Sequence, residues 1–297
     1  MAKKFSKSEK HICDLFKVGE SFQFEGITYT VKEVGKPTCS KGEPKTDVYV
    51  NATSLAGNKE FKISFKQENA DFLENKTNKE RAEQLLGSDW KNIISNATQR
   101  LKKEFESRPL IYKTSSGKTE AGAITLGWKF ELLNVSSGQL SGDMMLSHDQ
   151  VVDVYAGTNL KGDKKDASVN GKVISNCGIA NYILFEEQVP STIQEAANLL
   201  VPIEKYANDN SNVYFACKAL NYRTFHKKYD GNRPLAVYVN WSVENNKLSS
   251  ALIFDTPLMQ GGDYAFERLS ASLKELGIKD TNDIDDNIVN NPKIIHE

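Results

Sequence analysis

Long apolar runs are absent from the sequence, and this absence excludes one class of protein. No stretch of the 297 residues approaches the roughly 18 apolar residues of a membrane-spanning helix, so we expect no membrane partner. The basic start, MAKKFSKSEK, is not followed by an apolar segment, so we also expect no secretory signal.

Paired cysteines are also absent. The four cysteines are scattered along the chain, at Cys13, Cys39, Cys177 and Cys217, and no two have the spacing of a zinc site or a redox motif. Disulfide frameworks are typical of secreted proteins. We therefore expect free thiols and a cytoplasmic protein.

The charges are nearly balanced, because the chain has 38 lysines and arginines and 39 aspartates and glutamates. A DNA-binding chain needs basic patches rather than a basic total, so only the local distribution of charge bears on that class. Two other kinds of site lack their motifs. The four histidines have no zinc-hydrolase spacing. The segment TSSGKT, residues 114–119, lacks the first glycine of a phosphate-binding loop, because Tyr112 stands there.

The sequence does contain a mixed succession of helical and strand patterns. Residues 78–106 are strongly helical, with Gly87-Ser88 as a stop and a new N-cap, and residues 110–185 have mostly strand and loop patterns. A last amphipathic helix covers GGDYAFERLSASLKELGI, and the acidic tail after it is expected to be loose. This order predicts a mixed α/β or α+β fold with a β-rich second half.

The stretch TDVYVNATSLAGNKEFKISFK, residues 46–66, predicts a hairpin with one apolar and one polar side on each strand. On the first strand Val48 and Val50 alternate with Asp47, Tyr49 and Asn51. On the second strand the apolar side carries Phe61, Ile63 and Phe65, and the polar side carries Glu60, Lys62, Ser64 and Lys66.

The hairpin loop fixes the pairing of the two strands. If the turn is centred on Leu55-Ala56, paired residue numbers sum to about 111, which sets Asp47 opposite Ser64. Lys66 would then lie beside the same pair. A carboxylate placed there can hold a divalent cation, and a neighbouring ammonium group can stabilise a phosphate.

The segments KTDVYV and FKISFKQ together resemble the core of the PD-(D/E)XK nuclease superfamily, to which most Type II restriction endonucleases belong. The resemblance implies a mixed central sheet flanked by helices, with Asp47 as the metal-binding aspartate, Lys66 as the catalytic lysine and Mg²⁺ as the cofactor. It covers this hairpin and the helices around it. Ser64 stands where the family usually has a carboxylate, and Thr46 where it often has proline.

A second register stays open, because Glu60-Phe61-Lys62 matches the family's E-x-K pattern literally. We prefer Ser64 and Lys66, since Glu60 would lie roughly 13 Å along the strand from Ser64. A bulge in the loop would restore the literal match. The catalytic candidates are therefore Asp47, Ser64, Lys66, Glu60 and Lys62.

A neutral Ser64 means that a second metal-binding carboxylate has to come from elsewhere, since Mg²⁺ is usually held by one or two carboxylates and by phosphate oxygens. Three acids are candidates, Glu9 in the first helix, Glu33 at the end of the second strand and Glu68 after Lys66. We rank Glu9 first, because helices that precede this core in the family often contribute an acid.

Two basic segments are candidate DNA contacts. The first, NYRTFHKKYDGNRP, contains Arg223, His226, Lys227, Lys228 and Arg233, interleaved with aromatic residues. The second, KGDKKDASVNGK, contains Lys164 and Lys165. A solvated hairpin and a plain polar loop are the competing interpretations of these segments.

The resemblance implies a bacterial or phage-encoded, Mg²⁺-dependent Type II restriction endonuclease that cuts double-stranded DNA as a homodimer. We expect residues 1–110 to form the catalytic core, with residues 111–297 completing the same compact unit and supplying recognition and dimerisation elements. Two alternatives stay open. One is a repair, recombination or phage DNA-processing nuclease of the same superfamily, and the other is a DNA-binding protein that has lost catalysis.

Overall fold

The structure, a computed structural model, describes residues 7–66, 72–74, 77–185 and 190–297. The chain is a mixed α+β protein, as the sequence predicts. All four cysteines are free thiols, as expected. In the described part of the chain, no helix combines the length and the hydropathy needed to cross a membrane.

The chain forms two compact units, and each is built from several separate segments. Unit 1 contains Met1–Asp71, Glu83–Gly87 and Leu146–Asn212, and unit 2 contains Phe72–Ala82, Ser88–Met145 and Val213–Glu297. This differs from the expected single compact unit with a functional boundary after residue 110. The units combine distant segments because of long-range strand pairing. The strand at residues 182–185 pairs with the strand that ends at Lys66, and so joins the sheet of unit 1.

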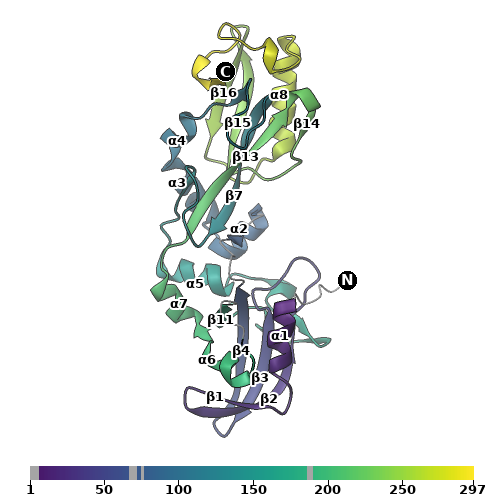
Figure 1. The fold of residues 1–297 in the computed structure, drawn as a ribbon, viewed down its shortest axis with the longest axis vertical. Helices are drawn as coiled ribbons and strands as arrows, with labels where there is room; N and C mark the ends of the chain where they lie inside the picture. The colour runs from purple at the N-terminus through teal and green to yellow at the C-terminus, as the bar shows by residue number, and fades with distance from the viewer. Residues whose placement is uncertain (1–6, 67–71, 75–76, 186–189) are drawn as a thin grey trace. The chain divides into compact units, whose positions relative to one another are not determined.

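The sheet of unit 1 begins as an antiparallel meander (Figure 1). Its order is β1-β2-β3-β4-β11-β12, with β11 parallel to β4 and β12 antiparallel to β11. The strands are β1 (Ser21–Phe24), β2 (Ile27–Gly35), β3 (Val48–Ser54), β4 (Gly57–Lys66), β11 (Tyr182–Phe185) and β12 (Val201–Pro202). A small two-stranded sheet of β9 (Ser168–Val169) and β10 (Lys172–Val173) completes the strands of this unit.

Two helices of unit 1 begin where a side chain caps their free N–H groups. Ser147 caps α5 (His148–Ala156). Thr192 and Glu195 form the capping box of α6 (Ile193–Asn198). The other two helices are α1 (Lys7–Leu15) and α7 (Ile203–Asp209).

The core of unit 1 is centred on the ring of Phe61, which is fully buried. Its ring lies 5.2–5.5 Å from four other aromatic rings, those of Phe22, Phe24, Tyr29 and Tyr182. Helix α1 covers this face of the sheet and buries Ile12, followed by Phe16, in the same cluster. The strand alternation predicted for the hairpin therefore defines the core face.

Replacing Phe61 with alanine is expected to destabilise unit 1 by about 3–5 kcal/mol, because the change leaves a cavity among aromatic rings that cannot collapse. Phe225 of unit 2 is the matched control, since its ring is 45% exposed and its loss should change stability by less than about 0.5 kcal/mol. Chemical denaturation followed by circular dichroism measures both. Equal losses for the two variants would contradict this packing.

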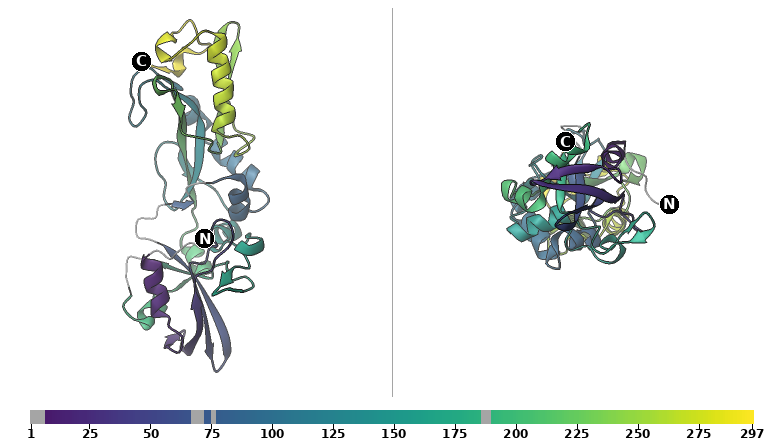
Figure 2. Two further views of the ribbon diagram at one scale, coloured as in Figure 1. Left: turned by 90° about the vertical axis from the view of Figure 1, so that its right-hand side faces the viewer. Right: turned by 90° about the horizontal axis from the view of Figure 1, so that it is seen from below.

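Unit 2 is built on the long buried strand β7 (Ala123–Leu133), which confirms a β-rich second half. It pairs with β13 (Tyr214–Arg223) on one side and β15 (Val237–Glu244) on the other, and α8 (Gly262–Glu275) packs against β15 (Figure 2). The remaining strands are β5 (Phe72–Glu74), β6 (Ile111–Tyr112), β8 (Ser141–Asp143), β14 (Lys228–Tyr229), β16 (Lys247–Ile253) and β17 (Ile295–His296).

The helical stretch expected at residues 78–106 consists of three short helices, α2 (Lys79–Leu86), α3 (Trp90–Gln99) and α4 (Lys102–Glu106). Gly87 ends α2 in the left-handed conformation, at φ +74°, as the sequence predicts. The N-cap of α3 is Asp89 rather than Ser88.

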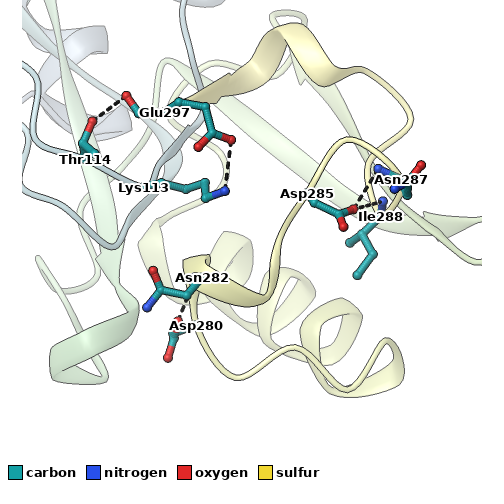
Figure 3. A network of polar contacts seen from close by, with 8 residues as sticks. All are labelled: Lys113, Thr114, Asp280, Asn282, Asp285, Asn287, Ile288 and Glu297. Atoms are coloured by element: carbon teal, nitrogen blue, oxygen red, sulfur yellow. Dashed lines mark hydrogen bonds and ion pairs between the residues drawn. The ribbon is translucent and has the colours of Figure 1, made fainter.

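The acidic tail is ordered, which corrects the expectation that it is loose. Side chains of Asp280 and Asp285 accept hydrogen bonds from backbone N–H groups two and three residues later, and these turns shape the segment (Figure 3). The last residues pair β17 in parallel with β6. The Lys113 amine binds the carboxylate of Glu297 at 3.0 Å.

Candidate active site

The β3–β4 hairpin has the register that the sequence predicts. Val48 lies opposite Ile63 and Tyr49 opposite Lys62, so paired numbers sum to 111. One step further, the backbone N–H of Asp47 donates to the carbonyl of Ile63 at 2.8 Å. Asp47 and Ser64 therefore face each other at the end of the hairpin furthest from its turn.

The carboxyl group of Asp47 is held by the backbone of β4. The N–H of Phe65 donates to Oδ2 of Asp47 at 2.8 Å. Burial raises the pKa of Asp47 to about 6, although the charge of Lys66 and the Phe65 hydrogen bond both lower it. The residue as a whole keeps part of its surface exposed, although its carboxyl group is largely buried.

A shielded ion pair lies close enough to Asp47 to act on that carboxyl. The Lys36 amine, just after β2, binds Oε2 of Glu9 on α1 at 2.5 Å, and the two side chains are only 10% and 19% exposed. The charge of Glu9 raises the pKa of Asp47, and the charge of Lys36 lowers it. Glu9, the first-ranked acid, is thus near Asp47.

Sequence reasoning missed Lys36, which the pairing of β2 with β3 brings to this end of the sheet. The observed pairing sets Gly35 opposite Tyr49, so the residue after Gly35 comes beside the start of β3. A lysine that directly follows the strand before the Asp47 strand is therefore a candidate for the same end of the sheet.

Lys66 ends β4 and is half-buried, and among the described residues no carboxylate forms an ion pair with it. Ser64, two residues earlier, is 1% exposed. Its hydroxyl has no hydrogen-bond partner in the described part of the chain, and the same holds for the hydroxyl of Thr46. Buried hydroxyl groups of this kind are costly, and both lie next to Asp47, Thr46 along the chain and Ser64 on the facing strand.

The rival residues Glu60 and Lys62 belong to a different polar cluster. Glu60 accepts a hydrogen bond from the hydroxyl of Tyr49 at 2.6 Å, and the Lys62 amine donates to the carbonyl of Asn176 at 3.2 Å. Both contacts lie further along the hairpin than Asp47, since Glu60 pairs with Asn51. The structure therefore does not bring them together with Asp47.

Glu33 also lies with this second cluster. Its carboxylate accepts from the amide of Asn170 at 3.4 Å. The pKa of Tyr49 is raised mainly by burial, and the charges of Glu60 and Glu33 raise it further. Glu68, the third acid considered, lies outside the described residues. Of the candidate acids that the structure describes, Glu9 is the one whose charge acts on Asp47.

The donor set at Asp47 fits a hard cation. Within the described ranges, no three histidine, cysteine, aspartate or glutamate residues gather as a metal site. Mg²⁺ needs fewer protein ligands than that, because water and substrate phosphate complete its coordination. Asp47 and Glu9 supply carboxylate oxygens from two different elements, a strand start and a helix.

The predicted basic residues of unit 2 lie between the end of β13 and the loop that follows β14. Arg223 is neutralised, because it forms ion pairs with Asp230, at 2.8 Å, and with Glu120. The others are exposed, and they are His226, Lys227, Lys228 and Arg233. Arg223 thus shapes the turn, and the four exposed residues are available to a partner.

Lys164 and Lys165 belong to the loop of unit 1 that contains the 3-10 turn Gly162–Lys164. The Lys164 amine donates to the side-chain oxygen of Gln84 at 3.0 Å, and the carbonyl of Lys165 accepts from the N–H of Gly178. Both residues are half-buried. Their contacts organise this loop, so they are weaker candidates for phosphate binding than the exposed cations of unit 2.

Family models, curated protein sequences and solved structures all give no match to this chain. A function for the chain therefore has to be argued from the chemistry of its own residues.

Proposed function

We propose that this protein is a Mg²⁺-dependent endonuclease of the PD-(D/E)XK type that cuts double-stranded DNA at specific sequences. The observation that carries the proposal is the surroundings of Asp47. Its carboxyl lies near the charges of Lys66 and Glu9 at one end of a mixed sheet. This is the combination of acid and amine that metal-assisted phosphodiester hydrolysis uses.

Each residue of the site has a role in this proposal. Asp47 and Glu9 would hold the Mg²⁺ ion, which would supply positive charge at the scissile phosphate and lower the pKa of the attacking water. The Lys66 amine orients the attacking water and stabilises the negative charge that develops on the phosphate. Ser64 carries no charge, so the negative charge of the site comes from Asp47, at the start of β3, and from Glu9 on α1.

DNA binding is assigned to the exposed cations of unit 2. Lysine and arginine side chains bind phosphates largely independently of sequence, and guanidinium groups also contact guanine edges. We propose that Lys227, Lys228 and Arg233 supply these contacts. We also propose a homodimer, because a two-fold symmetric enzyme cuts both strands of a palindrome with one type of site.

Incubation of the purified protein with supercoiled plasmid DNA and Mg²⁺ tests the proposal. We expect discrete, reproducible fragments, and no cleavage when EDTA replaces Mg²⁺. Random degradation would instead indicate a repair, recombination or phage DNA-processing nuclease.

A second candidate function is DNA binding without catalysis, and the neutral Ser64 in the usual acidic position favours it. A mobility-shift measurement with the same plasmid fragments separates the two. Binding that is unaffected by Mg²⁺ and leads to no cleavage would support the inactive protein.

A further inference from the structure

We infer that Lys36 is a positioning residue that fixes Glu9 beside Asp47, so that α1 supplies the acidic group that Ser64 does not provide on β4. The inference rests on the proposed nuclease function. It assigns a role to a residue that no motif in the sequence marks, and it explains how a PD-(D/E)XK-like site works with a serine in the acidic position.

The backbone anchors both partners of the ion pair. Glu9 lies on α1, one turn before Ile12, and Ile12 is 1% exposed in the main core. Lys36 follows β2, whose end is fixed by the pairing of Gly35 with Tyr49. The pair therefore joins a helix packed on one face of the sheet to the strand next to β3.

The ion pair is shielded from solvent. Its side chains are 10% and 19% exposed, whereas those of the Lys10–Asp14 pair on the same helix are 64% and 55% exposed. Exposed pairs of the second kind contribute little, because water and salt screen them. A shielded pair at 2.5 Å holds its partners in one arrangement, and loss of one partner leaves an uncompensated charge.

Lys36 also offsets the repulsion between two carboxylates. Glu9 and Asp47 are like charges when both are ionised, and the pKa of Asp47 is raised by Glu9 and lowered by Lys36. The Lys36 amine, which binds the Glu9 carboxylate directly, therefore offsets part of the repulsion between the two acids. Groups that orient a metal ligand in this way commonly change metal affinity by roughly 10–100-fold.

The test is the affinity of the full-length protein for Mn²⁺, measured by isothermal titration calorimetry, together with plasmid cleavage. Lys36→Met, which keeps the apolar stem, should weaken Mn²⁺ binding roughly 10–100-fold. Lys36→Arg should restore binding to within about three-fold, because it keeps the charge. Lys10→Ala is the matched control on the same helix and should bind Mn²⁺ like the wild type.

A double-mutant cycle tests whether Lys36 acts through Glu9. Glu9→Gln combined with Lys36→Met should bind Mn²⁺ no more weakly than Glu9→Gln alone. Additive losses, or a Lys36→Met protein that is folded by circular dichroism and binds Mn²⁺ like the wild type, would overturn the inference while the nuclease proposal stands. A wild-type protein that neither binds Mn²⁺ nor cuts DNA would overturn both.

Discussion

Replacing Lys66 with alanine is expected to reduce plasmid cleavage by roughly 10²–10³-fold or more, because the amine stabilises charge that develops in the transition state. DNA binding should change little, since one phosphate contact among several contributes a small part of the affinity. The protein should also fold normally, because Lys66 lies at the end of β4 and forms no ion pair with the described residues. Single-turnover cleavage with Mg²⁺ and a mobility shift measure the two effects separately.

Lys62→Ala is the matched control, because Lys62 lies on the same strand and bonds to a backbone carbonyl away from Asp47. Its cleavage rate should stay within about three-fold of the wild-type rate, since it belongs to the cluster of Tyr49 and Glu60. If Lys62→Ala abolished cleavage and Lys66→Ala did not, the literal Glu60-Phe61-Lys62 register would be the active one.

Replacing Asp47 with asparagine is expected to abolish cleavage and at the same time to stabilise the protein at pH 8. The amide keeps an oxygen for the N–H of Phe65, but it cannot carry the charge that binds a cation. The gain in stability follows from the pKa, which the folded structure raises from 3.8 to about 6. The folded protein therefore prefers the neutral carboxyl, and the unfolded chain does not.

The sign of the pH dependence follows from the same shift. The stabilisation from protonated Asp47 is fully present below pH 3.8 and is lost as the pH rises through about 6. Above that pH the ionised group costs about 3 kcal/mol at most, at 1.36 kcal/mol for each pKa unit. The advantage of Asp47→Asn over the wild type should thus be largest at pH 8 and should shrink at pH 5.

Urea denaturation at the two pH values measures this difference. Asp209→Asn is the control, because Asp209 forms an exposed ion pair with Lys205, and its loss should change stability by less than about 1 kcal/mol. A destabilised Asp47→Asn protein at pH 8 would mean that attraction from the neighbouring lysines outweighs the burial of this carboxylate. The pKa of Asp47 would then not be raised.

An active site that lowers stability fits the proposed function. Groups arranged for catalysis are often held at a cost that the rest of the fold offsets. The aromatic cluster around Phe61 contributes stability that offsets such a cost. It packs against the apolar face of the hairpin that carries Asp47 and Lys66.

The sequence predicted part of the candidate site because part of it is local. Strand alternation separates Asp47 from Val48, and a short hairpin fixes its own register, so the pairing of Asp47 with Ser64 followed from the position of the turn. The preference for Glu9 came from a family resemblance, and the structure brings Glu9 near Asp47. Lys36 was missed because its role depends on two elements that have no common local pattern.

The sequence by itself determined the period and polarity of each element, since these depend on residues a few positions apart. Tertiary structure decided which distant segments of the chain pack against one another. It paired β11 with β4 across more than a hundred residues and ordered the acidic tail. It also divided the chain into two units whose segments alternate along the sequence. The burial that shifts the pKa of Asp47 also arises only there, because burial and electrostatic interactions depend on distance in space and not on distance along the chain.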